Sequence, residues 1–426
     1  MKTDIVIVGC GVSGLYCALS LPRDKRITVV TKSKADKSDS YLAQGGICVL
    51  RGESDYHSYF EDTMRAGRYE NDPLSVDIMI RSSPEIIDDL VKYGVEFERD
   101  AKSGEFAYTR EGAHSNPRIL FHADETGKEI TSKLLACVRK LKNVTITEDY
   151  TVVDIIESDG ECAGVTGHDS NGNYTNIFAD YTLLATGGIG GLYAHSTNYS
   201  HLTGDAIAIA LNHGIELKNI DYVQIHPTTL YTEKKGREFL ISESVRGEGA
   251  ILLNAKGERF VNELLPRDVV ATAIYEQMKK DNAPHVWLSM APIPTDEIKS
   301  HFPHIYEHCL AEGYDVTLEA IPVVPSQHYY MGGIRVNEYS KTSMDRLYAI
   351  GETACNGVHG KNRLASNSLL ESLVFARRAA NDICDGYTVS NADTSLRPDP
   401  ESYENYAEKY KKLVLDAIEK ERKSHE

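Results

Sequence analysis

The second half of the sequence gathers side chains that are suited to binding carboxylates. Arginine and histidine recur there beside glycine and small polar residues. The stretches are Gln224-Ile-His226, Ser242-Glu243-Ser-Val-Arg246, Pro266-Arg267, His328-Tyr-Tyr-Met-Gly-Gly333 and 356–363, which ends in Arg363. Taken singly, each has an ordinary explanation, such as a turn histidine or an exposed ion pair of little energetic value. Taken together they predict one pocket, because guanidinium groups recognise carboxylates through paired hydrogen bonds.

The start of the sequence predicts the site of a dinucleotide. Gly9, Gly11 and Gly14 have the spacing G-x-G-x-x-G, between an apolar β-branched run at 5–8 and an apolar helical segment. A strand, a tight turn and a helix in this order place a pyrophosphate at the helix N-terminus, where unpaired N–H groups face it. The acidic residue that usually follows the second strand is absent, and Lys32 stands there instead, which disfavours NAD.

Composition and charge exclude several classes of protein. The chain has 426 residues, enough for one large or two ordinary domains. Its formal net charge of −17 argues against nucleic acid and anionic membranes as partners. Eight scattered cysteines without a C-x-x-C pair predict no metal site, reduced thiols and a cytoplasmic location. The uncharged run 5–22 is interpreted as a buried strand and helix, so we expect a soluble protein.

Local patterns predict an α/β fold in two parts. Segments 1–219 and 334–385, rich in strands that end in glycines, are expected to form one domain. Residues 220–333, which are richer in proline, are expected to form a separate lobe inserted into it. A linker is expected over 386–400 and a helix over 401–426.

Helix and strand boundaries follow from proline, glycine and apolar periodicity. Residues 56–93 are expected to be helical, with helix starts at Asp72-Pro73 and Ser83-Pro84. Short strands are expected over 144–184, broken by Gly160, Gly164 and Asn171-Gly172. The final helix is expected to pack through one amphipathic face. That face carries Tyr403, Tyr406, Tyr410, Leu413 and Ala417.

Ordered motifs along residues 1 to about 385 resemble the flavoprotein family of succinate dehydrogenase, fumarate reductase and L-aspartate oxidase. The motifs are GCGVSG, SYLAQGG, TREGAHS, LLATGGIGGLY, QIHPTTLY, SESVRGEGAILLN, RFVNE, PRDVVA, HYYMGGI, LYAIGE and HGKNRLASNSLLE. The resemblance implies a Rossmann-like FAD-binding domain of the GR2 type, an inserted α+β capping domain and a short C-terminal helix. Longer members of the family carry a C-terminal helical bundle, and this sequence has room for about one of its helices.

The resemblance implies that FAD is the cofactor and that it is bound non-covalently. Family members that attach the flavin covalently use a histidine in the loop before A-Q-G-G, whereas residues 38–41 of this sequence contain no imidazole. The residues implied in cofactor binding are Gly9, Gly11, Val12, Ser13, Gly14, Lys32, Ser40, Tyr41, Ala43, Gln44, Gly45, Gly46, Thr186, Gly187, Asp205, Glu352, Ser368 and Leu369.

The same resemblance assigns substrate contacts. His226, His328 and Arg363 are implied to hold the substrate carboxylates. Further substrate-binding residues are Gln224, Ser242, Glu243 and Arg246. Arg267 matches the arginine that the family is proposed to use as a proton donor when fumarate is reduced. Because an arginine stays protonated in ordinary settings, its role could equally be electrostatic.

Glu111, within the loop 109–115, is predicted to distinguish L-aspartate from succinate. Succinate-type members usually carry an uncharged residue in this loop. A carboxylate in a pocket for a dianion is unfavourable unless it meets a cation, and the ammonium of L-aspartate is one. At about 4 Å and an effective dielectric constant of about 20, such a pair is worth roughly 4 kcal/mol before desolvation. A surface glutamate in a loop is the simple alternative.

The implied reaction is hydride transfer from C2 of L-aspartate to N5 of FAD, giving iminoaspartate, with the electrons then passed to oxygen or to fumarate. In the family, iminoaspartate feeds quinolinate synthase and hence NAD biosynthesis, so quinolinate synthase is an implied partner. Three alternatives are open. They are a soluble fumarate reductase or succinate dehydrogenase flavoprotein, an FAD-binding protein without turnover, and an enzyme similar to FAD-dependent 3-ketosteroid dehydrogenases.

Overall fold

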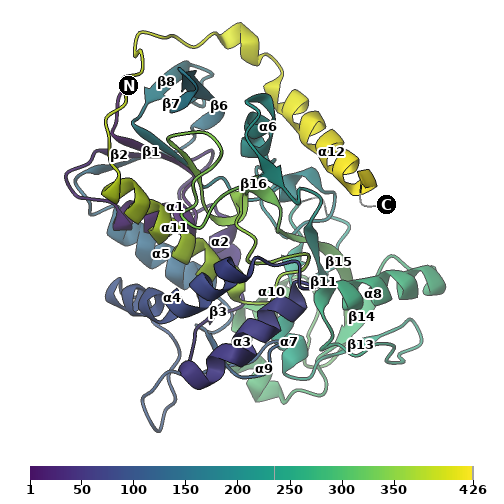
Figure 1. Ribbon diagram of the computed structural model, residues 1–426. Helices are drawn as coiled ribbons and strands as arrows, with labels where there is room; N and C mark the ends of the chain where they lie inside the picture. The colour runs from purple at the N-terminus through teal and green to yellow at the C-terminus, as the bar shows by residue number, and fades with distance from the viewer. Residues whose placement is uncertain (235, 425–426) are drawn as a thin grey trace.

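A five-stranded parallel sheet forms the centre of the first part of the molecule (Figure 1). The computed structural model describes residues 1–234 and 236–424. In spatial order the strands are β17 (Leu347–Ala349), β9 (Tyr181–Leu184), β1 (Ile5–Val8), β2 (Ile27–Val30) and β5 (Val144–Thr147). Alternate residues of β1 enter different cores: Ile7 packs with the helices on one face, and Val6 packs on the other. The sheet is therefore buried on both faces, which parallel sheets require.

Helices cover one face of this sheet, and a second, smaller sheet covers the other. On the first face α1 (Val12–Ser20) packs against α5 (Thr126–Val138) and α11 (Asn367–Asp385). Beyond them lie α3 (Glu53–Ala66) and α4 (Pro73–Lys92). The opposite face meets the antiparallel strands β6 (Thr151–Ser158), β7 (Glu161–His168) and β8 (Tyr174–Phe178), with α6 (Asp205–Asn212) beside them. Short elements complete this part: α2 (Asp39–Leu42), β3 (Ile47–Cys48), β4 (Ile119–Leu120), η1 (Gly190–Leu192) and η2 (Gly351–Thr353).

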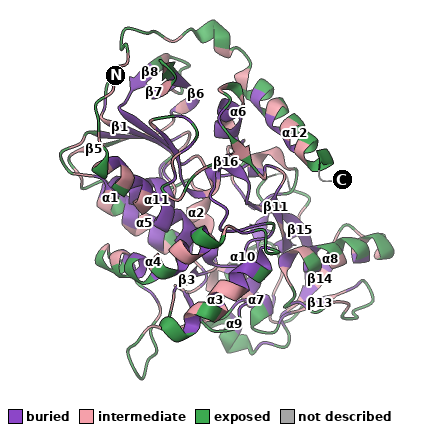
Figure 2. Ribbon diagram, viewed as in Figure 1, coloured by how far each residue is buried: buried purple, intermediate pink, exposed green. Residues whose placement is uncertain are grey.

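The uncharged run at the N-terminus forms β1 and α1, which confirms its interpretation as a buried strand and helix. Figure 2 shows both elements among the buried parts of the fold. Within residues 1–234 and 236–424, no helix combines the length and the apolar character that crossing a membrane needs.

The second part is built on a five-stranded sheet of its own. In spatial order its strands are β12 (Phe239–Leu240), β11 (Val223–Leu230), β15 (Ile321–Tyr330), β14 (Val286–Ser289) and β13 (Ile251–Leu253). The helices are α7 (Glu243–Gly247), α8 (Arg267–Asp281), α9 (Thr295–His301) and α10 (Pro303–Ala311). Ile274 of α8 and Val323 of β15 belong to its separate hydrophobic core. Sheet and helices together confirm the α/β fold with an inserted α+β part.

Strands β10 (Leu217–Lys218) and β16 (Gly333–Arg335) join the two parts. They pair antiparallel, and β16 also pairs with β18 (Ala354–Cys355). The chain therefore leaves the first part and returns to it at neighbouring strands, close to the predicted limits of the lobe. We keep those limits, 220 and 333, as a proposal.

The predicted helix start at Ser83-Pro84 is wrong. Helix α4 runs through this pair from Pro73 to Lys92, with Asp72 as its N-cap. Pro84 cannot donate to the Ile80 carbonyl four residues before it, and the Ser83 hydroxyl donates to that carbonyl instead, at 2.6 Å. The hydroxyl thus satisfies the carbonyl that the proline leaves without its usual partner.

The predicted strand break at Gly164 is also wrong. Gly164 lies inside β7 with φ of +133°, where a Cβ atom would come within 2.1 Å of the Ile177 carbonyl oxygen. The glycine permits close approach of β8 rather than ending the strand. Gly160 and Gly172 do separate strands, as predicted.

The C-terminal helix α12 (Tyr406–Ser424) packs on α6 (Figure 1). Its buried residues are Tyr410, Val414 and Ile418, and the predicted Tyr406, Leu413 and Ala417 are partly buried against the same core. Tyr403 precedes the helix, in the 3-10 turn η3 (Pro400–Tyr403). The predicted amphipathic helix is present, and its packed face contains Val414 and Ile418 in addition to the predicted residues 406, 410, 413 and 417.

Candidate active site

The turn from β1 into α1 needs glycine at two positions. Gly9 has φ of +119°, and a Cβ atom on it would lie 2.0 Å from the carbonyl oxygen of Ala185 at the end of β9. A Cβ atom on Gly14 would lie 2.2 Å from the Gly9 carbonyl oxygen. Gly9 therefore lets two strand ends meet, and Gly14 lets the helix pack against the turn, as the fingerprint predicts.

One cavity runs from this turn to the sheet of the second part, with an empty volume of about 1780 Å³ that includes its open mouth. Most of the predicted residues line it. The cofactor residues that do so are Gly9, Gly11, Ser13, Lys32, Ser40, Ala43, Gln44, Gly45, Gly46, Thr186, Gly187, Asp205, Glu352, Ser368 and Leu369. The predicted substrate residues that do so are Glu111, His226, Ser242, Glu243, Arg267, His328 and Arg363. Val12, Gly14, Tyr41, Gln224 and Arg246 are not part of the lining.

Lys32 stands where an acidic residue usually follows β2, and it forms an ion pair with Asp205. Its ammonium lies 2.7 Å from the carboxylate of Asp205 and 3.0 Å from the hydroxyl of Thr203. Asp205 is the first residue of α6 and lines the same end of the cavity. A carboxylate is therefore present near the end of β2, but it comes from α6 and is held there by the lysine.

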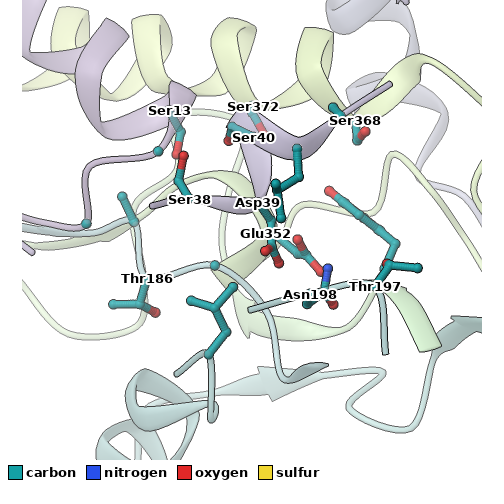
Figure 3. A pocket seen from close by; sticks show the side chains of 18 of the residues that line it. Ser13, Ser38, Asp39, Ser40, Thr186, Thr197, Asn198, Glu352, Ser368 and Ser372 are labelled. Atoms are coloured by element: carbon teal, nitrogen blue, oxygen red, sulfur yellow. The ribbon is translucent and has the colours of Figure 1, made fainter. Parts of the chain in front are cut away.

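Several polar atoms of the cavity wall have no hydrogen-bond partner among the described residues. They are Ser38 Oγ, Asp39 Oδ2, Gln44 Oε1, Asn198 Oδ1, His226 Nε2 and Arg363 Nε. Ser38 and Ser40 lie next to Gly11 of the glycine turn. Figure 3 shows both near Ser13, with Asp39 and Glu352 together in the middle of the view and Asn198 beside them. Buried polar atoms without partners are unfavourable, so this wall fits a large polar ligand such as FAD.

The pKa values of the Asp39 and Glu352 carboxyls are raised in the wall of the cavity. Burial raises the pKa of Asp39 to about 7, and burial together with the charge of Asp39 raises the pKa of Glu352 to about 8. Arg237 and Arg363 are the cations that oppose these shifts. Both groups therefore hold protons in the FAD-free fold at pH values where ordinary carboxyls have lost them.

The FAD-free protein should lose stability through this pair as the pH rises. An unfolded carboxyl titrates near pH 4, so between about pH 5 and 8 the folded form binds more protons and stability falls with pH. We expect the double variant Asp39→Asn/Glu352→Gln to gain melting temperature relative to the wild type over this range. Thermal unfolding of both FAD-free proteins at a series of pH values measures the difference. A difference that is constant with pH would contradict the assignment.

Arg267, the first residue of α8, lies where the cavity meets the second sheet. Its Nε donates to the Glu243 carboxylate, and its Nη1 donates to Gln224 Oε1 at 2.8 Å. Arg246 is buried behind them, 3.9 Å from Glu243. Gln224 and Arg246 therefore do not line the cavity themselves. Gln224 contacts Arg267, and Arg246 contacts Glu243, and these two partners do line it.

His226 and His328 form a second group beside Arg267, with ring centroids 5.1 Å apart. His226 follows one of two register shifts between β11 and β15, a bulge of the kind that redirects side chains near sites. Thr228 N–H donates to its Nδ1, and Thr197 Oγ1 lies 2.8 Å from His328 Nδ1. Burial and the charge of Arg267 keep the pKa of both rings well below the usual value. Both are therefore neutral hydrogen-bonding groups at pH 7.

Arg363 completes the cationic end. Its Nη1 donates to Ser368 at 2.9 Å, and its guanidinium lies 4.6 Å from the centre of the Tyr329 ring. Burial and the charge of Arg267 lower the pKa of Arg363 to about 10, so it remains protonated at pH 7. With its Nε unpartnered, it can still bind an anion in the cavity.

Glu111 is a second carboxylate of this group, beside Glu243. It is only 4 % exposed, and its two carboxylate oxygens accept hydrogen bonds from Ser244 at 3.0 Å and Ser366 at 2.7 Å. Burial and then the charge of Glu243 raise its pKa. The simple alternative of a surface glutamate is therefore excluded, because Glu111 lines the cavity.

Some lining residues were missed by the sequence reasoning. They include Thr197, Asn198, Arg237 and Ser366. Ser366 stands inside the quoted motif HGKNRLASNSLLE, which could have indicated it. Thr197 and Asn198 lie between regular elements, where no periodicity or glycine spacing marks them.

A Rossmann-like sheet with its glycine turn, a long polar cavity and a cationic end define an FAD-binding flavoprotein. The family described as "FAD binding domain" matches residues 4–369. The chain is 47 % identical to an L-aspartate oxidase of Clostridium perfringens, over 97 % of this chain and 94 % of that protein. It is 50 % identical to an L-aspartate oxidase of Clostridium acetobutylicum, over 90 % of this chain and 88 % of that protein. The chain belongs to the L-aspartate oxidase family of FAD-binding flavoproteins.

The solved structures agree with this fold. A quinol fumarate reductase chain of E. coli superposes with a TM-score of 0.87 at 28 % identity. The match covers 99 % of this chain and 74 % of that chain. The recognised family and the fold class are both confirmed by these comparisons.

Proposed function

We propose that this protein oxidises L-aspartate to iminoaspartate with FAD as its cofactor. The observation that carries the proposal is Glu111, a buried carboxylate of the cavity wall that is held by two hydroxyl groups, whereas its neighbour Glu243 is paired with Arg267. Arg267 and Arg363 suit the carboxylates of the substrate, and Glu111, which is not held by a cation as Glu243 is, suits its ammonium. The names of the relatives from two Clostridium species support the same substrate.

FAD would lie along the glycine turn and the polar wall. The N-terminus of α1 at Gly11 would face its pyrophosphate, and Asp205 and Glu352 would face hydroxyl groups. When bound, the flavin supplies a two-electron acceptor for the C2–H bond of the substrate. Residues 38–41 offer no histidine for a covalent link, so we propose that FAD dissociates from the denatured chain.

The substrate carboxylates would meet Arg363 at one end, and His226 and His328 at the other. Arg363 is charged and holds an unpartnered N–H, while His226 Nε2 has no partner among the described residues. Arg267 is fixed by Glu243 and Gln224, so its guanidinium is already oriented before substrate arrives. Such preorganised donors stabilise developing charge more than mobile ones do.

Glu111 would bind the ammonium group and thereby select the amino acid. Two hydroxyl groups hold its carboxylate in place, and burial raises its pKa. An ammonium neighbour favours the charged form of Glu111, so substrate binding and ionisation of Glu111 support each other. The raised pKa also suits the Glu111 carboxylate to accept a proton as the amine becomes an imine.

The remaining parts of the proposal follow from the family resemblance. Oxygen, giving hydrogen peroxide, or fumarate would take the electrons from the reduced protein. Iminoaspartate would pass to quinolinate synthase in the cytoplasm and enter NAD biosynthesis.

Fumarate reduction is the second candidate. The arginines and histidines bind any four-carbon dicarboxylate, and the fold matches a fumarate reductase chain. A protonated Glu111 would leave Glu243, which is paired with Arg267, as the carboxylate beside the substrate, and a dianion such as fumarate or succinate would tolerate this. The two candidate functions therefore differ in whether the Glu111 carboxyl group is ionised or protonated.

Reconstitution with FAD tests the proposed function. We expect a yellow protein that releases all its flavin on acid precipitation and forms one hydrogen peroxide per L-aspartate consumed in air. Flavin that stays with the precipitate would contradict non-covalent binding. A yellow protein that consumes no L-aspartate would contradict the proposed reaction.

A further inference from the structure

A second layer of buried charge lies behind Glu111, in residues that the proposed reaction does not use. Its centre is Arg118, which is fully buried. The guanidinium lies 3.0 Å from the carboxylate of Asp55 and 2.8 Å from that of Asp62, both on α3. A buried arginine held by two carboxylates cannot leave without exposing unpaired charge, so it is a rigid anchor.

His114 connects this anchor to the far wall of the site. Its Nδ1 lies 3.0 Å from Arg118 Nη1, and its Nε2 lies 3.0 Å from the carbonyl oxygen of Ala365. A guanidinium can only donate, so Nδ1 accepts and the proton resides on Nε2, which donates to Ala365. Burial and the charge of Arg118 lower the pKa of His114 to about 4, which agrees with one neutral tautomer at pH 7.

His114 is connected to the surroundings of Glu111 through its backbone and through the Nε2 end of its ring. The backbone N–H of His114 donates to the Glu111 carbonyl at 3.3 Å. Ser366, next to Ala365, donates to the Glu111 carboxylate at 2.7 Å. Between Glu111 and His114, Ala113 has φ of +66°, a left-handed conformation that residues with a side chain rarely adopt. The loop is therefore held in a conformation that it would not keep on its own.

We propose that His114 is a positioning residue that makes the site selective for an amine-bearing substrate by fixing Glu111 against Ser366. This inference rests on the proposed function, because it assigns the selectivity to Glu111. With the loop fixed, the carboxylate stays at the place where the ammonium arrives. With the loop released, Glu111 can move toward Arg267, whose charge already attracts it, and the carboxylate is lost as an ammonium site.

Binding to the pre-reduced holoprotein separates selectivity from turnover. Flavin already reduced with dithionite cannot oxidise L-aspartate, so calorimetry can measure Kd for L-aspartate and for succinate. His114→Phe keeps the ring and removes both hydrogen bonds. We expect it to raise Kd for L-aspartate about tenfold and to change Kd for succinate less than about threefold. His168, which contacts Tyr406 and is not part of the cavity lining, offers the matched control His168→Phe, with both constants unchanged.

Two further variants keep the test decisive. His114→Gln offers an amide oxygen to Arg118 and an amide N–H to Ala365, so it should restore most of the preference for L-aspartate. His114→Asn reaches Arg118 but not Ala365, and it should lose the preference in the same direction as His114→Phe. Loss of the preference in His114→Gln as severe as in His114→Phe would contradict the two-bond bridge.

A double variant tests whether His114 acts through Glu111. In the background Glu111→Gln, we expect His114→Phe to leave the ratio of the two dissociation constants unchanged, because the interacting partner is gone. An equal rise of Kd for both ligands in His114→Phe would overturn the inference. A change in the ratio of the two constants that is as large in the Glu111→Gln background as in the wild-type background would overturn it too. A wild-type protein without preference for L-aspartate would instead overturn the proposed function, and the inference with it.

Discussion

Glu111→Gln is expected to lower kcat/KM for L-aspartate oxidation by about 100-fold or more, while fumarate reduction stays within about threefold of the wild type. The Coulomb attraction between the carboxylate and an ammonium at about 4 Å is roughly 4 kcal/mol before desolvation, and most of it disappears with the charge. A glutamine has the shape of a protonated glutamate and can still bond with Ser244 and Ser366. The site for a dianion should therefore survive the change.

Steady-state kinetics with both substrates measures this difference. Glu105→Gln is the matched control, because Glu105 is an exposed carboxylate in the segment before the Glu111 loop. We expect it to leave both activities unchanged. Equal losses of both activities in Glu111→Gln would remove the specificity argument.

Arg363→Leu is expected to weaken L-aspartate and fumarate alike, by about 100-fold in KM or about 3 kcal/mol. Arg363 is buried, charged at pH 7 and only partly satisfied by Ser368, so its remaining N–H groups are available to a carboxylate. Leucine fills part of the volume but offers no donor to the carboxylate that both substrates share. A buried carboxylate without its partner then bears the full cost of desolvation.

The control for this variant is Arg335→Leu, which removes an exposed arginine paired with Glu216. We expect normal KM values for both substrates in the control. Unchanged half-saturation for both substrates in Arg363→Leu would place Arg363 outside the site. A raised KM for only one of the two substrates would show that Arg363 does not hold the carboxylate that both substrates share.

Features that depend on neighbouring residues could be predicted from the sequence. Gly14 packs against the Gly9 carbonyl five residues before it, and Gly9 meets Ala185 after β9, the strand beside β1 in the sheet. The spacing of these glycines was enough to indicate the β1–α1 turn. The helix start at Asp72-Pro73 follows from a local cap as well. Pro84 shows the limit of such rules, because the hydroxyl of Ser83 replaces the hydrogen bond that the proline removes.

Features that depend on distant residues could not be predicted in the same way. The carboxylate near the end of β2 belongs to Asp205, which lies 173 positions after Lys32. Gln224 and Arg246 were predicted as substrate contacts from the family resemblance, and in the structure their side chains contact Arg267 and Glu243 without lining the cavity themselves. The inward orientation of Glu111 was expected from the family resemblance, and the hydroxyls of Ser244 and Ser366 that hold it come from two other segments.

The most direct test of the central claim is an anaerobic titration of the oxidised holoprotein, followed by the flavin absorbance. We predict that L-aspartate bleaches the flavin at stoichiometric amounts and that the same amounts of succinate do not. Bleaching by succinate but not by L-aspartate would contradict the claim that Glu111 receives an ammonium group.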